Sequence, residues 1–188
     1  TASKAFETPT TTEFANPSGG GFNQTIKPQK STSYEIGIKT FNNKYSFEAA
    51  IFQTNVKDEL TPFEDSEQPG RTFFTNAGSS DRRGLELTSI RRFYDQLEFS
   101  TTYTYSDFKF NHFRNAGGEI YDGKRIPGIP KNLLNFNLSW SNESGAYANL
   151  DTTFTGEFYA DNGNQTKVDS YTVSNLRLGK NFIRNDLD

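Results

Sequence analysis

The sequence contains no cysteine, and His112 is its single histidine. Without cysteine, a disulfide framework, a thiolate nucleophile and a zinc–cysteine site are all excluded. A lone histidine in a polar segment has no partners for a metal site. It also provides no set of nucleophile, base and orienting group. We therefore expect no metal site and no enzymatic activity.

The chain also lacks methionine and any long apolar run. No segment approaches the roughly 20 apolar residues of a transmembrane helix, which excludes a helical membrane protein. The net charge of −3 offers no cationic surface for nucleic acid. Since the chain starts at Thr1 without an initiator methionine or a signal peptide, we expect a piece of a longer protein.

What the chain does have is aromatic residues dispersed among small polar ones. Its mean hydropathy of −0.77 would by itself suggest disorder. However, 18 phenylalanines and 9 tyrosines argue against disorder and favour strands. The segment LEFSTTYTYS (97–106) alternates Leu97, Phe99 and Tyr103 with Glu, Ser and Thr. A period of two is typical of a strand that separates two environments.

Seven segments show this character and are predicted as strands. They lie at residues 31–41, 44–56, 82–92, 96–108, 131–140, 146–159 and 169–182. Most are about 10 to 14 residues long, whereas strands of soluble proteins cluster near 5 or 6. Ten residues cover roughly 33 Å, and a tilt of about 45° reduces this to roughly 23 Å, close to the apolar band of an outer-membrane barrel.

The predicted connections alternate between short and long. Short ones follow the first, third and fifth strands, at 42–43, 93–95 and 141–145. Long ones follow the second, fourth and sixth strands, at 57–81, 109–130 and 160–168. Transmembrane barrels have short periplasmic turns and long extracellular loops. We therefore expect an all-β fold, a fragment of a large antiparallel transmembrane β-barrel, with Leu97 and its neighbours facing lipid and the polar positions facing a wet lumen.

Several segments then resemble the C-terminal barrel region of TonB-dependent outer-membrane receptors. The segment AFETPTTTEFANP is similar to a Phe-x-x-Pro-Thr-x-x-Glu segment of an extracellular loop in that family. The segment IKPQKSTSYEIGIK resembles its Leu-Lys-Pro-Glu-x-Ser-x-x-Tyr-Glu-x-Gly-x-Lys signature, with Gln29 where Glu is usual. The segment FFTNAGSSDRRGLEL resembles an Asn-x-Gly run followed by Gly-x-Glu. The matching positions are Lys27, Pro28, Ser31, Tyr34, Glu35, Gly37, Lys39, Asn76, Gly78, Gly84 and Glu86.

This resemblance implies about seven strands of a 22-stranded barrel in the outer membrane of a Gram-negative bacterium. Residues 1–30 would form an extracellular loop, and residues 31–188 barrel strands with short periplasmic turns and long extracellular loops. Such a receptor imports a scarce solute, most often a ferric siderophore, when a TonB partner moves a plug domain that is expected outside this chain. Two rivals stay open: a receptor for another solute, such as a cobalamin-like cofactor, a copper complex or a glycan, and a soluble β-rich binding or adhesion module.

The long segment 109–130 holds the candidate ligand-binding residues Arg114, Tyr121, Lys124 and Arg125. Cationic and aromatic groups suit an anionic, partly aromatic iron chelate through charge and cation–π contacts. Alternatively, these residues contact lipopolysaccharide or other loops, an interpretation that the sequence supports equally well. On the predicted luminal face, Glu35, Lys39, Glu86 and Arg177 form either a relay toward the plug or an ordinary ion-pair ladder.

Because unpaired strand edges are costly in lipid, these seven strands are not expected to fold as an isolated piece.

Overall fold

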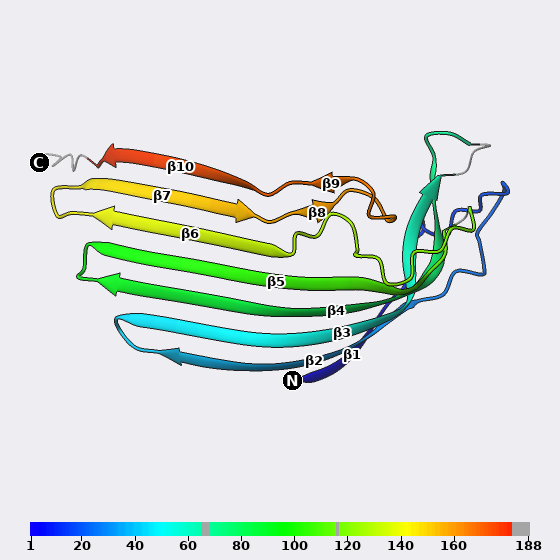
Figure 1. Cartoon of the computed structure of the whole chain (residues 1–188), viewed down its shortest axis with the longest axis horizontal. Coiled ribbons are helices and arrows are strands. Elements are labelled where there is room, and N and C mark those ends of the chain that lie inside the picture. The colour runs from blue at the N-terminus through cyan, green and yellow to red at the C-terminus, as the bar shows by residue number, and fades with distance from the viewer. Residues whose placement is uncertain (65–67, 116, 182–188) are drawn as a thin grey trace, which may run out of the picture.

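The computed structural model describes residues 1–64, 68–115 and 117–181. It shows one antiparallel sheet in the order β1-β2-β3-β4-β5-β6-β7-β10, and a small separate sheet of β8 and β9 (Figure 1). The strands are β1 (Ala2–Glu7), β2 (Gln29–Phe41), β3 (Tyr45–Glu64), β4 (Thr72–Phe93), β5 (Leu97–Phe113), β6 (Asn132–Ser141), β7 (Ala146–Thr155), β8 (Phe158–Tyr159), β9 (Lys167–Val168) and β10 (Tyr171–Lys180). The sheet is open, with β1 and β10 at its two edges.

The three short connections lie together at one end of the sheet, and the long ones lie at the other end (Figure 1). In the first short turn, the Asn42 side chain accepts hydrogen bonds from the backbone N–H groups of Lys44 and Tyr45, at 2.8 and 3.0 Å. The second turn contains Tyr94 in a left-handed conformation. The three predicted short connections are confirmed, and the connections between β5 and β6 and between β1 and β2 are the long ones at the opposite end.

The longest predicted loop is largely strand, which corrects the expectation for residues 57–81. β3 continues to Glu64, β4 already begins at Thr72, and the two pair along this extension. The register shifts between Lys57 and Glu59, which leaves Asp58 on β3 as an extra residue without a partner on β4. Asp58 adopts a left-handed conformation. The acidic, proline-containing sequence has the composition of a loop, but a bulge of this kind allows pairing to resume beyond it. The extensions of β3 and β4 rise together at the long-loop end of the sheet (Figure 1).

Other boundaries differ in both directions: the predicted strands 146–159 and 169–182 are shorter in the structure, where β7 ends at Thr155 and β10 spans Tyr171–Lys180. β5 continues to Phe113, so the segment predicted as the loop 109–130 begins as strand. The segment 160–168 is mainly the connection between β8 and β9, two short strands that pair with each other. Near the N-terminus, residues 2–7 form β1 against β2, and the connection from β1 to β2 lies between Glu7 and Gln29.

One face of the sheet is apolar and uncovered. The register aligns Ile36, Ile51, Leu85 and Tyr105 across β2 to β5, so these side chains share a face. Ile36 is 69% exposed, Ile51 is 55% exposed, and Leu178 on β10 is 68% exposed. A soluble sheet would bury such a row in a core. Among the described residues there is no helix long and apolar enough to cross a membrane, a finding that concerns helices alone.

The opposite face is a polar ladder. On this face, one row of paired residues across β2 to β6 consists of Lys39, Glu48, Thr88, Thr102 and Asn135. Lys39 forms an ion pair with Glu48. The Asn135 amide donates to the Thr102 hydroxyl at 3.2 Å. This arrangement, apolar outside and polar inside, is that of a transmembrane barrel wall.

The buried apolar side chains gather at the long-loop end. They are Ile26, Val56, Phe73, Phe110 and Phe113. The strands themselves form one layer, so a core develops only where the long loops fold back over the sheet. This end therefore provides the enclosed surface from which a binding site can be built.

Candidate functional site

The long connection between β5 and β6 folds back onto the end of β5. The N–H of Phe110 donates to the Lys124 carbonyl at 2.9 Å, and the N–H of Tyr121 donates to the Phe113 carbonyl at 2.9 Å. The ring of Phe113 stacks on Phe110 with centroids 4.5 Å apart, and on Tyr121 with centroids 5.5 Å apart. Three stacked rings thus anchor the loop, which explains why Phe110 and Phe113 are buried.

A second loop, between β8 and β9, is joined to the first by Asn164. The Asn164 side-chain oxygen accepts the Arg125 N–H at 2.7 Å, and its amide nitrogen donates to the Arg125 carbonyl at 2.8 Å. The side chain therefore pairs with Arg125 as a neighbouring strand residue would. Gly128 N–H donates to the Tyr159 carbonyl at 2.8 Å and adds a backbone contact between the same two segments.

Between these loops and the end of β3 lies a cavity of about 650 Å³, here called the outer cavity. Its size falls within the usual range for ligand sites. The walls include apolar and aromatic groups, among them Leu60, Phe110, Tyr121 and Ile126. The lining also carries three carboxylates, Glu59, Glu119 and Asp161, and it includes no lysine or arginine among the described residues.

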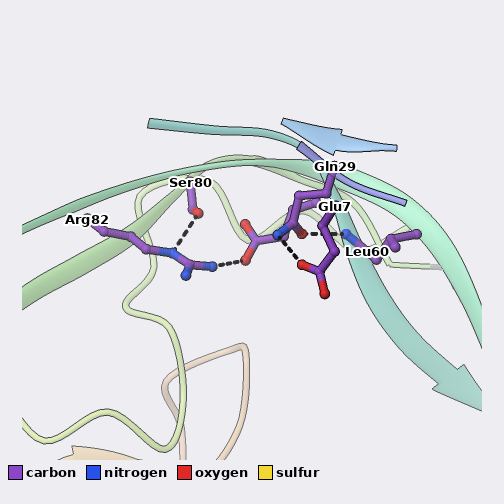
Figure 2. Close-up of polar contacts among 6 residues, drawn as sticks. Glu7, Gln29, Leu60, Ser80 and Arg82 are labelled. Atoms are coloured by element: carbon purple, nitrogen blue, oxygen red, sulfur yellow. Dashed lines mark hydrogen bonds and ion pairs between the residues drawn. The ribbon is translucent and has the colours of Figure 1, made fainter. Parts of the chain in front are cut away.

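Glu59 is held by an arginine on the neighbouring strand. Its Oε1 atom pairs with Arg82. The Nε atom of Arg82 donates to the Ser80 hydroxyl at 3.3 Å (Figure 2). The Glu59 side chain is 14% exposed, and within the described part of the chain its buried Oε2 atom has no hydrogen-bond partner. One carboxylate oxygen is thus neutralised by Arg82, while the other keeps its capacity to accept a hydrogen bond.

Next to this pair, Gln29 connects two segments. Its Oε1 atom accepts the Leu60 N–H at 3.2 Å, and its Nε2 atom donates to Glu7 at 3.4 Å (Figure 2). An amide can accept and donate at once, whereas an ionised carboxylate can only accept. Gln29, the position that departs from the family signature, is therefore suited to bridge a backbone N–H and a carboxylate.

The other two carboxylates of the cavity are held in their ionised form. The Tyr121 hydroxyl donates to Glu119 at 2.5 Å and the Asn115 amide donates to it at 2.8 Å, which lowers the pKa of Glu119. The same hydrogen bond to Glu119 raises the pKa of Tyr121. Asp161 accepts the N–H groups of Gln165 and Thr166, at 3.1 and 2.5 Å, and these bonds lower its pKa.

The four predicted site residues occupy different places. Tyr121 lines the outer cavity, whereas Arg114, Lys124 and Arg125 are not among its lining residues. Arg114 and Lys124 are exposed. The guanidinium carbon of Arg125 lies 5.8 Å from the ring centroid of Tyr159. Of the four predicted residues, the structure therefore places Tyr121 in the cavity lining and the three cations outside it.

The carboxylates of the cavity were missed by sequence reasoning for two different reasons. Glu59 belongs to the segment 57–81, which was predicted as a long connection, and it lies instead on β3. Glu119 and Asp161 belong to separate loops, which the contacts of Asn164 with Arg125 and of Gly128 with Tyr159 bring together. No spacing in the sequence signals those contacts.

His112 lies on β5 and is exposed, with its Nδ1 atom 3.3 Å from Asp122. In the described ranges, no group of three or more His, Asp or Glu side chains is placed to hold a metal ion.

A smaller hollow of about 250 Å³ lies on the polar face. It is lined by Glu35, Lys39, Glu48 and Glu86, together with Gly37 and neighbouring residues. Three of the four side chains considered for a luminal relay therefore meet here. The fourth, Arg177, lies across the sheet on β10, so the four do not form one cluster.

The residues that carry the family signature have identifiable roles. The Asn76 amide pairs with Lys27 through both its backbone groups, at 2.7 and 2.9 Å, and donates to the Asp58 carbonyl at 2.7 Å. A Cβ on Gly78 would collide with the His112 carbonyl, and one on Gly84 would collide with the Phe52 ring. Two of the signature segments, far apart in the sequence, thus meet at Asn76.

Comparison with known proteins extends this description. Residues 1–187 match the family described as TonB dependent receptor-like, beta-barrel. The ferrioxamine receptor of Yersinia enterocolitica is 26% identical over 167 residues, which cover 86% of this chain and 21% of that protein. The vitamin B12 transporter BtuB of Photobacterium profundum is 24% identical over 178 residues, covering 93% of this chain and 27% of that protein.

Among solved structures, the siderophore receptor PiuA from Acinetobacter baumannii superposes with a TM-score of 0.72. The aligned region is 21% identical and covers 98% of this chain and 27% of that one. This likeness shows the barrel fold. The chain therefore spans only about a quarter of the length of the proteins that it matches.

Proposed function

The chain belongs to the TonB-dependent receptor family, within its β-barrel domain, and from this premise we propose that it forms part of the wall of an outer-membrane importer for ferric siderophores. The observation that carries the membrane placement is the uncovered apolar face, on which Ile36 and Ile51 are 69% and 55% exposed. Lipid contact makes that exposure favourable, and the polar face then lines the lumen.

In this proposal the short turns face the periplasm and the long loops face the outside. Residues 1–30 contribute to the extracellular side, with β1 as the strand that leads into it. Residues 31–188 contribute strands of the wall. The hollow lined by Glu35, Glu48 and Glu86 faces the plug domain, which a TonB partner displaces during transport.

The outer cavity is the proposed ligand-contacting surface of this segment. Its aromatic wall at Phe110 and Tyr121 offers stacking and hydrogen bonding to a bound chelate. Arg114 and Lys124 are exposed on the adjacent loop, where they are placed for anionic groups of the ligand or of lipopolysaccharide. No catalytic step is assigned to any of these residues.

A receptor for another solute is the second candidate, because the relatives include a vitamin B12 transporter. A soluble β-rich module is disfavoured by the apolar face, since a soluble sheet would need a second layer to bury that face.

The experiment is deletion of the gene for the full-length receptor, followed by growth under iron limitation and measurement of radioactive iron uptake from a panel of ferric chelates. We expect slower growth under iron limitation and loss of uptake of at least one chelate. Growth in iron-rich medium is the control. Normal growth and uptake with every iron chelate, together with a defect in cobalamin or copper acquisition, would establish the second candidate instead.

A further inference from the structure

The charge of the outer cavity differs from the expectation for an anionic ligand. Glu119 and Asp161 line it without an ion pair to any described residue, and the third carboxylate, Glu59, is paired with Arg82. The lining thus carries two uncompensated negative charges.

Three cations near the cavity are engaged in other contacts, whereas Arg114 and Lys124 are exposed on the β5–β6 connection and lie outside the lining. Arg82 is paired with Glu59, and the Arg125 guanidinium lies over the Tyr159 ring. Lys167, on the hairpin next to the cavity, pairs with Glu157 at 2.5 Å. None of these cations is among the lining residues that the structure describes. Inside the cavity, an anionic ligand would therefore meet carboxylates and no cation among the described lining residues.

The carboxylates are fixed in place. Hydrogen bonds from Tyr121 and Asn115 orient Glu119, and the backbone of the β8–β9 connection orients Asp161. Since these donors favour the ionised forms, both groups keep their charge at neutral pH. The Oε2 atom of Glu59 is buried beside this wall, without a hydrogen-bond partner among the described residues.

We propose that the outer cavity selects a chelate that carries a positively charged amine arm over a neutral or anionic chelate of the same size. The apolar and aromatic wall, at Phe110, Tyr121 and Ile126, contacts the body of the ligand, while Glu119 and Asp161 attract the ammonium group. This inference rests on the proposed function, which it makes more specific by assigning the ligand a charge.

The test uses the full-length receptor in outer-membrane vesicles and three ferric trihydroxamate complexes that share one iron centre. The first ends in a free amine, the second in an N-acetyl group and the third in an N-succinyl group, so that their net charges are positive, zero and negative. Dissociation constants are measured by equilibrium binding of radioactive iron at low and high salt. We expect affinity to fall in that order, and the differences to shrink at high salt.

Two isosteric variants, Glu119→Gln and Asp161→Asn, remove one charge each and retain a hydrogen-bond acceptor. Each is expected to reduce the preference for the amine over the acetyl complex roughly fivefold, the effect of one unit charge about 4 Å away in water. Glu143→Gln is the matched control, because Glu143 is exposed in the short turn between β6 and β7 at the opposite end of the sheet.

Equal affinities for the three complexes, tighter binding of the succinyl complex, or an unchanged preference in both variants would overturn this inference. Failure of all three complexes to bind would overturn it as well. The proposed function is judged separately, by the iron uptake of the deletion strain, so that loss of the charge preference alone leaves that function intact.

Discussion

A charge on the apolar face of the sheet should be far more damaging than the same charge on the polar face. Ile51 lies in the interior of β3, 55% exposed, in register with Ile36 and Leu85 on the apolar face. If this face contacts lipid, Ile51→Arg places a guanidinium near the middle of the apolar band. The expected cost there is about 2 to 4 kcal/mol, or roughly 30- to 1000-fold in the ratio of folded to unfolded protein.

The matched control is Thr104→Arg on the opposite face, where the directly paired residue on β4 is Glu86. An arginine at this position meets water and a carboxylate, and we expect a change below about 1 kcal/mol. Both variants are made in the full-length receptor, folded into lipid vesicles and compared by equilibrium denaturant titration. Equal losses for the two variants, or a larger loss for Thr104→Arg, would refute the assignment of the faces.

Three further predictions concern the long-loop end. Gly78→Ala should lower the free energy of unfolding by about 1 to 3 kcal/mol in denaturant titrations, because the added Cβ would collide with the His112 carbonyl. Gln29→Glu should destabilise the protein by about 1 kcal/mol in denaturant titrations at neutral pH, since the amide donor to Glu7 becomes a like charge. The pKa of Asp161 is lowered by backbone hydrogen bonds, so its contribution is present above the ordinary carboxyl pKa and lost as pH falls through the lowered value. Amide exchange of the β8–β9 hairpin, corrected for its intrinsic pH dependence, should therefore remain slow to about pH 4 and quicken below it.

The wall of the barrel was predictable from the sequence because two environments act on alternate residues. Leu97, Phe99 and Tyr103 lie on the same face as Ile51, as the alternation predicted. Every strand that borders lipid and water must repeat this alternation. The sequence of each strand therefore indicates which of its side chains face lipid. The short turns were predictable for the same reason, since they end the alternation abruptly.

The ends of the strands were not predictable in the same way. Beyond Lys57 the sequence ELTPFEDSEQPG has the acids and prolines of a loop, yet β3 continues to Glu64. Outside the membrane both faces meet water, so alternation is no longer required. Pairing there depends on a bulge at Asp58 and on the Asn76 side chain. Neither feature leaves a repeating pattern in the sequence from which it could be predicted.

The proposed ligand-contacting end could not be derived from composition either. Arg114, Lys124 and Arg125 dominate the charge of their loop in the sequence, but the surface that encloses a cavity carries Glu119 and Asp161 from two loops. Which charges line a site depends on contacts between loops. Such contacts are made by single side chains whose partners are distant in the sequence.

Two asparagines show how this end acquires a defined shape without regular secondary structure. Asn76 and Asn164 each present an amide that accepts from one backbone N–H and donates to the carbonyl of the same residue, at Lys27 and Arg125 respectively. Each side chain replaces a strand neighbour where no strand is available. Loops joined in this way lose less conformational entropy when a ligand binds, because part of their ordering precedes binding. The wall is therefore held by repeated strand pairing, whereas the loops beyond it are joined by stacked rings, single backbone hydrogen bonds and these side-chain amides. Substitutions at Asn76 or Asn164 are expected to alter ligand affinity more than barrel stability.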